Sequence, residues 1–146
     1  MKSCMGLISG TKYLVDTNVL VYSVNRESPL YNQSKELLET GLREGVSFVV
    51  AHQNLVEFIA VLSRGYGIQK ASAVADAKAF ASRFEIIFPL PTTIDTFFEL
   101  IAKNAAVYPF DLYLAATMLD NQVTRIVTEN TKDFQDLGLE EIIRIA

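Results

Sequence analysis

YLVDTNVLV, residues 13–21, is the stretch that decides the fold of this chain. Three apolar or aromatic residues lead into Asp16, two polar residues follow, and a second apolar segment begins. This order predicts a buried strand that delivers one carboxylate to its C-terminal end and then turns into a helix. In open α/β sheets, ligands bind in the crevice beyond the carboxyl ends of the strands. Asp16 is therefore the first candidate for chemistry, although an aspartate after a strand also commonly caps a helix.

The rest of the chain alternates between apolar runs of strand length and helical patterns. Further strands are expected at residues 46–51, 85–88, 125–127 and 142–145. Helices are expected at residues 17–24, 31–43, 52–64, 69–83, 92–107 and 111–121, with a polar loop or short helical turn at 128–134. Such alternation predicts a mostly parallel sheet with helices on both faces. We expect one α/β domain over residues 1–146.

The composition describes a folded globular protein without a broad basic surface. Half of the 146 residues are hydrophobic, and 13 Lys and Arg against 17 Asp and Glu give a net charge of −4. Any contact with nucleic acid would therefore depend on metal ions and a few local cations. Arg26, Lys12 and Lys132 flank the expected cleft as candidate phosphate contacts, and each also fits a solvated surface position.

Several classes of protein are excluded by what the sequence lacks. Cys4 is the single cysteine, which excludes an internal disulfide and a multi-thiolate metal site. The apolar run at residues 4–8 is too short for a secretory signal, and no run approaches the roughly 20 residues that span a bilayer. The chain has no glycine-rich phosphate loop of the kind that binds nucleotide cofactors. We expect a cytoplasmic protein with no membrane contact.

Acidic or amide side chains follow most of the expected strands. Asp16 follows the first strand, Glu57 lies early in the helix after the second, and Asp111 lies at a helix start just after Pro109-Phe110. Asn130 and Asp133 follow the strand at residues 125–127. Taken singly, each acid has an ordinary structural explanation, as a helix cap, a partner of a helix macrodipole or a solvated loop residue. Four such placements at one end of one sheet are harder to explain in that way.

Clustered carboxylates repel one another unless a cation neutralises them. Oxygen ligands alone favour Mg²⁺ or Mn²⁺, and Mg²⁺ commonly combines a few carboxylates with waters and substrate phosphate. Such an ion activates water, orients a phosphodiester and stabilises the charge on the leaving oxygen. His52, the only histidine, is expected to begin a helix and not to act as a base.

Four segments together resemble the signature segments of PIN-domain proteins, and most closely those of VapC-type toxins. They are LVDTNVL at residues 14–20, NLVEF at 54–58, FDLYLAA at 110–116 and VTENTKDF at 127–134. No single segment is specific, but the ordered set covers essentially the whole chain. The resemblance implies a three-layer α/β/α sandwich on a five-stranded parallel sheet.

The resemblance also implies a Mg²⁺- or Mn²⁺-dependent endoribonuclease that cuts single-stranded RNA. Asp16, Glu57, Asp111 and Asp133 would be its catalytic, metal-binding acids. Asn130 stands where many relatives carry a further acid, so the number of ions stays open. Thr17, Asn18, Thr128 and Asn130 would orient the carboxylates or contact the substrate. The resemblance further implies the toxin of a toxin–antitoxin pair, inhibited by a small antitoxin protein, and a homodimer.

Two other functions stay open on the sequence. The first is a non-catalytic PIN scaffold that binds RNA or a protein partner, which Asn130 and the acidic balance favour. The second is phosphoryl transfer through a phospho-aspartate with Asp16 as the nucleophile. A dehalogenase-like site would need an acid at position 18, but this residue is Asn18. A receiver-like site would need an aspartate at the end of the third strand, where this chain has Phe88-Pro89.

Overall fold

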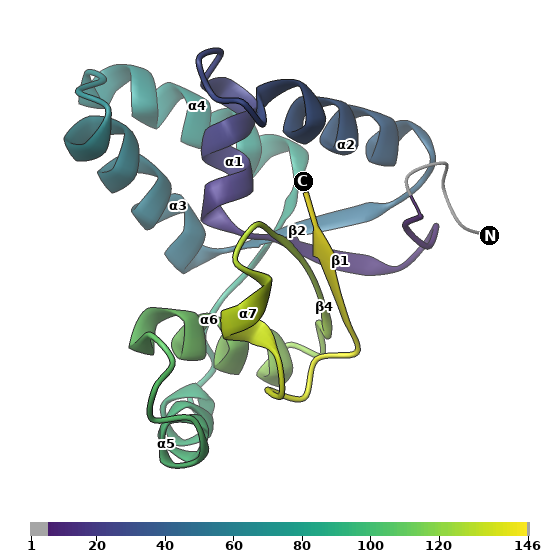
Figure 1. Cartoon of the computed structure of the whole chain (residues 1–146), viewed down its shortest axis with the longest axis vertical. Helices are drawn as coiled ribbons and strands as arrows, with labels where there is room; N and C mark the ends of the chain where they lie inside the picture. The colour runs from purple at the N-terminus through teal and green to yellow at the C-terminus, as the bar shows by residue number, and fades with distance from the viewer. Residues whose placement is uncertain (1–5, 146) are drawn as a thin grey trace.

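The computed structural model describes residues 6–145 as a five-stranded parallel sheet between two layers of helices (Figure 1). Cys4 lies outside the described residues. The strands, in the sheet order β3-β2-β1-β4-β5, are β3 (Glu85–Ile87), β2 (Ser47–Ala51), β1 (Lys12–Val15), β4 (Arg125–Thr128) and β5 (Glu141–Arg144). The predicted three-layer α/β/α architecture is therefore confirmed.

The helices form between the strands, as the periodicity predicts. They are α1 (Thr17–Val24), α2 (Tyr31–Arg43), α3 (His52–Ala60), the π-helix η1 (Val61–Gly65), α4 (Lys70–Arg83), α5 (Thr93–Lys103), α6 (Pro109–Asp120) and α7 (Thr131–Phe134). Among the described residues, no helix has the length and apolar character needed to cross a membrane.

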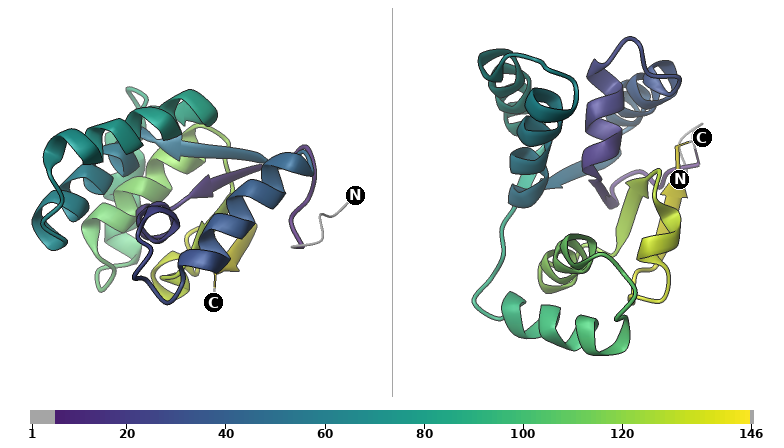
Figure 2. Two further views of the ribbon diagram at one scale, coloured as in Figure 1. Left: turned by 90° about the horizontal axis from the view of Figure 1, so that it is seen from above. Right: turned by 60° about the vertical axis from the view of Figure 1, so that its left-hand side comes forward.

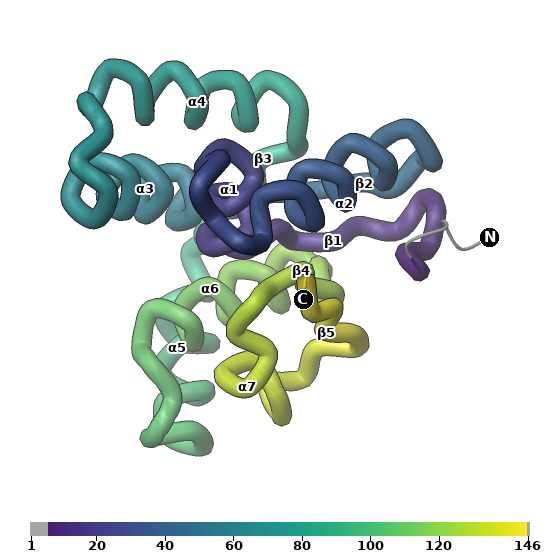
Figure 3. Tube along the Cα trace, turned by 45° about the horizontal axis from the view of Figure 1, so that its top comes forward, coloured from purple at the N-terminus to yellow at the C-terminus, as the bar shows by residue number. Residues whose placement is uncertain are grey.

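Alternating side chains of the strands serve two separate cores. Tyr13 and Val15 of β1 are fully buried in the core under α1, α2, α3 and α4, whereas Leu14 belongs to the core under α6 and α7. Figures 2 and 3 show the same division, with α1–α4 on one side of β1 and α5–α7 on the other. Because both faces are covered, the central strands are mostly apolar after their first residue.

The parallel register brings the C-terminal ends of the central strands to one edge. Val15 of β1 pairs with Val127 of β4, and the Asp16 amide donates a 3.0 Å hydrogen bond to the Val127 carbonyl. Lys12, the first residue of β1, lies at the opposite edge and pairs with Glu85 over 3.0 Å. The expectation that Lys12 flanks the cleft was therefore wrong, because Lys12 begins β1 whereas the cleft lies beyond the C-terminal end of that strand.

Most helices lie within two residues of their predicted bounds, but one differs more in extent and one in helix type. The helix expected over residues 92–107 ends at Lys103, where Asn104 adopts φ −139° and its side-chain amide donates to the Leu100 carbonyl. The helix expected over 52–64 is an α-helix to Ala60 and then a π-helix to Gly65. Apolar periodicity alone does not separate these two helix types.

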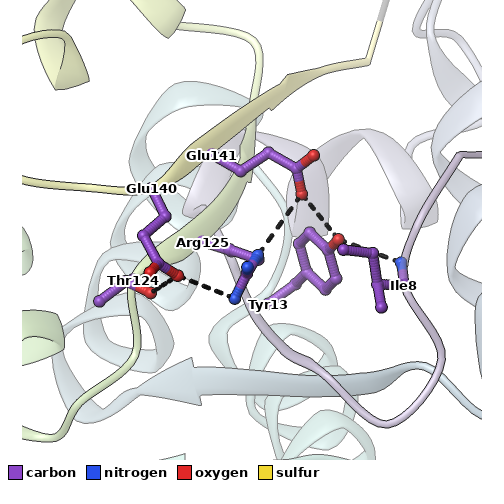
Figure 4. A network of polar contacts seen from close by, with 6 residues as sticks. All are labelled: Ile8, Tyr13, Thr124, Arg125, Glu140 and Glu141. Atoms are coloured by element: carbon purple, nitrogen blue, oxygen red, sulfur yellow. Dashed lines mark hydrogen bonds and ion pairs between the residues drawn. The ribbon is translucent and has the colours of Figure 1, made fainter.

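A polar network fastens three strands at the edge where they begin (Figure 4). The buried hydroxyl of Tyr13 donates to Glu141 Oε1 over 2.7 Å and accepts from the Ile8 amide over 3.1 Å. Arg125 of β4 lies 3.7 Å from the same carboxylate and 3.0 Å from Glu140. Structural contacts occupy the edge where the strands begin, so a site is expected at the edge where the strands end.

Candidate active site

Asp16 both caps a helix and faces a cavity. Its Oδ1 accepts a 2.8 Å hydrogen bond from the Thr17 amide at the start of α1, and its Oδ2 accepts a 2.7 Å bond from the Thr128 hydroxyl. The side chain also lines a cavity of about 300 Å³ at the C-terminal edge of the sheet. Burial raises the pKa of Asp16 to about 6, although the bonds from Thr128 and Thr17 oppose that rise. The capping role and the site role therefore coexist in one carboxylate.

Glu57 of α3 reaches the same cavity and is held by two side chains. Glu57 Oε2 accepts from the Thr17 hydroxyl over 3.1 Å, and Oε1 accepts from Gln53 Nε2 over 2.7 Å. Gln53 also donates to the Phe110 carbonyl over 2.8 Å, so it connects α3 to the start of α6. Gln53 was not among the predicted site residues, although its spacing of four residues from Glu57 places both on one helix face.

Asn54 is a second supporting residue that sequence analysis left without a role. Its side chain is fully buried, donates to the Thr17 hydroxyl over 3.1 Å and accepts from the Ala51 amide over 2.8 Å. Asn54 thereby fixes the hydroxyl that contacts Glu57. The signal was present in the sequence, because Asn54 lies three residues after the end of β2, where a side chain can bond the first amides of a helix.

Asp111 brings a third carboxylate to the cavity from the first turn of α6. Its pKa is raised to about 7, chiefly by burial and also by a shared hydrogen bond with Asp133 and the charges of Asp16, Asp133 and Glu57. These causes show that the four predicted acids lie near enough to repel one another. Asp133 itself, in α7, does not line the cavity.

Asn130 lies between Asp111 and Asp133. Its Nδ2 donates to Asp111 Oδ2 over 3.2 Å and to Asp133 Oδ2 over 3.0 Å, and its backbone amide donates to the Thr128 hydroxyl over 2.9 Å. Asn18 lines the cavity and accepts from the Glu129 amide over 3.3 Å. The structure thus brings together all eight predicted site residues. Six of them line the cavity, and Thr128 and Asp133 lie outside its lining but bond to Asp16 and Asn130, respectively.

His52 and Arg26 do not line the carboxylate cavity. His52 is the first residue of α3, as expected, and its ring centroid lies 4.8 Å from that of Phe88. Arg26 lines a neighbouring cavity of about 280 Å³. Tyr22 and Tyr66, which sequence analysis did not single out, line the carboxylate cavity itself.

The chemistry of this donor set suits a hard divalent cation. Asp16, Glu57 and Asp111 face one cavity with no Lys or Arg among its lining residues, and burial, together with the charges of neighbouring carboxylates, raises the pKa values of Asp16 and Asp111. Within residues 6–145, however, no three His, Cys, Asp or Glu side chains are arranged to hold an ion directly. The oxygens are instead engaged by Thr17, Thr128 and Asn130. The site therefore fits an ion that keeps several of its waters, as Mg²⁺ does.

Known proteins share both sequence and fold features with this chain. The sequence model of the PIN domain matches residues 13–139. No curated protein matches the chain. The fold is similar to that of VapBC2 from Rickettsia felis bound to a promoter DNA fragment, with 22% identity, a TM-score of 0.69, and 92% of this chain and 98% of that chain covered.

Two further solved structures share the fold. DNA-bound VapBC from Salmonella typhimurium has 18% identity and a TM-score of 0.72, with 93% of this chain and 99% of that chain covered. The sarcin-ricin loop cleaving toxin VapC20 from Mycobacterium tuberculosis has 17% identity and a TM-score of 0.65, with 78% and 86% covered. At these identities the likeness concerns the fold alone.

Proposed function

This chain belongs to the PIN-domain family, and from that premise we propose that it is a divalent-metal-dependent endoribonuclease that cuts single-stranded RNA. The observation that carries the proposal is the convergence of Asp16, Glu57 and Asp111 on one cavity at the C-terminal edge of the sheet. Mg²⁺ or Mn²⁺ bound there would supply Lewis-acid chemistry toward a phosphodiester.

The residues of the chain would prepare that site by position and charge. Burial disfavours the ionised forms of Asp16 and Asp111, so a cation bound in the cavity would stabilise both carboxylates in their charged state. Thr128 and the Thr17 amide fix both oxygens of Asp16, and Gln53 and Thr17 fix both oxygens of Glu57. Carboxylates held in this way need little reorganisation on binding, which favours precise orientation of a substrate phosphate.

The direct test is cleavage of a single-stranded RNA with Mn²⁺ added to metal-free protein. The wild type is expected to cut the RNA, and Asp16→Asn and Asp111→Asn are expected to lose at least about 100-fold in rate. Asp95→Asn serves as the control, because Asp95 lies in the first turn of α5 and does not line the carboxylate cavity. Equal cleavage by the wild type and Asp16→Asn would refute the assignment.

A non-catalytic PIN scaffold is the second candidate, and Asn130 is the observation that favours it. Its amide donates to two acids at a position where a further carboxylate would add charge. Calorimetric titration with Mn²⁺ separates the two functions. The nuclease requires Mn²⁺ binding that Asp111→Ala abolishes, whereas a scaffold without a metal site would show no binding in either protein.

We further propose that the chain is the cytoplasmic toxin of a toxin–antitoxin pair. The support is the fold, which it shares with the VapBC structures. A reading frame beside its gene that encodes a small DNA-binding protein is expected. Expression of the chain alone should arrest growth, co-expression of that neighbour should restore it, and Asp16→Asn should be harmless without it.

A homodimer is the assembly that we propose. Several large apolar side chains on and beside α5 and α6 are exposed, including Ile94 (46%), Phe98 (58%) and Phe110 (54%). Together with Phe97, Pro109 and Tyr113, Ile94 and Phe110 line an apolar groove of about 410 Å³. Exposed apolar surface of this kind marks protein contacts. Light scattering after gel filtration should give a dimer mass for the wild type and a monomer mass for Phe98→Glu.

A further inference from the structure

The cavity that holds the carboxylates has a second, aromatic kind of lining. Tyr22 of α1 and Tyr66, just after η1, line it beside Val21 and Val61. Among the described residues, neither phenol oxygen has a hydrogen-bond partner. Burial raises the pKa of Tyr22, and the charges of Glu129, Tyr66 and Asp16 raise it further, so this ring lies close to the acids.

The backbone after α3 places Tyr66 at this position. In the π-helix η1 each backbone hydrogen bond spans one more residue than in an α-helix. Such segments are rare, and many of them occur at functional sites. Gly67 follows with φ +65°, and the Ile68 amide donates to the Leu62 carbonyl over 3.0 Å, which closes the turn. The side chain of Tyr66 stays 51% exposed after this turn. A large aromatic ring is thus held at the mouth of the site by a conformation that favours glycine next to it.

Tyr66 also separates the carboxylate cavity from a neighbouring one. It lines both, and the second cavity, of about 280 Å³, is also lined by Asn25 and Arg26, which follow α1. Arg26 is the only Lys or Arg among the described residues that line these two cavities. With a net charge of −4, the protein offers little phosphate attraction along this path. Affinity for a single strand must then come from another interaction, and stacking of bases on aromatic rings supplies it in sequence-tolerant sites.

We propose that Tyr66 is the stacking platform for an unpaired nucleobase next to the scissile phosphate. This inference rests on the proposed ribonuclease function. A phosphate at the carboxylates places its attached sugar and base at the cavity wall, where Tyr66 and Tyr22 lie. The strand then continues past Tyr66 toward Arg26. The substrate is therefore RNA whose base beside the cut is unpaired and free to leave its own stack.

The test uses a single-stranded RNA with 2-aminopurine, whose fluorescence falls when it stacks on an aromatic ring. Binding is measured without metal in an Asp111→Asn background, which prevents cleavage and removes one negative charge. Adding Tyr66→Leu is expected to abolish the quenching and to weaken binding roughly 5- to 150-fold. Tyr66→Phe should retain both signals. Tyr31→Leu is the matched control, because Tyr31 begins α2 and lines neither cavity.

Cleavage kinetics with Mn²⁺ give a second readout in the otherwise unchanged chain. Tyr66→Leu should raise KM by a similar factor, with a smaller effect on kcat, and double-stranded RNA should be a poor substrate for the wild type. If the wild type cuts RNA while Tyr66→Leu keeps its quenching, affinity and KM, the stacking role is overturned and the ribonuclease function stands. The stacking role is also overturned if Tyr66→Leu changes the oligomeric state but leaves quenching, affinity and KM unchanged. Failure of the wild type to bind or cut RNA would overturn both.

Discussion

The hydroxyl of Thr128 donates a 2.7 Å hydrogen bond to Oδ2 of Asp16, joining side chains that are 112 residues apart in the chain. Thr128 is fully buried at the end of β4, and Asp16 follows the end of the adjacent strand β1. Because a bond to the ionised carboxylate favours its charged form, Thr128 opposes the rise that burial imposes on the pKa of Asp16.

Replacing Thr128 by Val should therefore raise the pKa of Asp16 and weaken the site at neutral pH. Hydrogen bonds to charged groups contribute roughly 1.5–3 kcal/mol, so we expect a loss of about 10-fold or more in kcat/KM near pH 6.5. The acidic limb of the pH profile should move to higher pH. Thr128→Ser keeps the donor and should restore the wild-type limb. An unshifted limb in Thr128→Val would contradict this role.

The free energy of unfolding should decrease as the pH rises from about 4 to about 7 in metal-free protein. Asp111 has a pKa near 7 when folded, against 3.8 as its ordinary value, so the folded state binds more protons than the unfolded state over this window. Asp16, with a pKa of about 6, acts in the same direction up to its own pKa. Urea unfolding at several pH values measures the slope. Asp111→Asn should flatten it, and Mn²⁺ should raise stability most at the upper end.

Asn130→Asp should make the protein depend more strongly on a metal ion. The substitution removes the amide that donates to both Asp111 and Asp133 and adds a charge between them. We expect a melting temperature lowered by several degrees without metal, since about 1 kcal/mol corresponds to a few degrees for a domain of this size. Mn²⁺ should recover the difference and bind more tightly than in the wild type. Asn130→Ala, which removes the amide without adding charge, should show no gain in Mn²⁺ affinity.

Tyr13→Phe should destabilise the fold without changing the site. The buried hydroxyl of Tyr13 bonds both the Ile8 amide and Glu141 at the far edge of the sheet (Figure 4), so its loss leaves two polar groups without this partner. The expected cost is about 1–3 kcal/mol in urea unfolding. RNA cleavage well below the unfolding midpoint should match the wild type, because Tyr13 lies at the opposite end of β1 from Asp16. A specific loss of cleavage would show that the two edges are coupled.

Much of the architecture followed from local patterns. The apolar run before Asp16 became β1, the helical pattern at residues 31–43 became α2, and the acids after the strands reached one edge because parallel strands end there. The local pattern did not predict where α5 ends. Its last turn is accompanied by a bond from the Asn104 side chain to the Leu100 carbonyl, and apolar periodicity carries no information about such a bond.

The site shows the same division. Asp16, Glu57 and Asp111 could be placed from the sequence, because each follows a strand or begins a helix. Asn130 was also among the predicted site residues, but its bond to Asp111 was not predictable, and Tyr66 was not identified. Both depend on backbone conformation and on contacts between distant parts of the chain.

By itself, the sequence determined the alternation of strands and helices and the edge at which the carboxylates gather, because both follow from local periodicity and from the direction of parallel strands. Only the tertiary structure decided which oxygens are held by Thr17 and Thr128, that Asn130 donates to both Asp111 and Asp133, and that Tyr66 lines the cavity. Those relationships join residues from different elements, and they exist only once packing has fixed the distances between them.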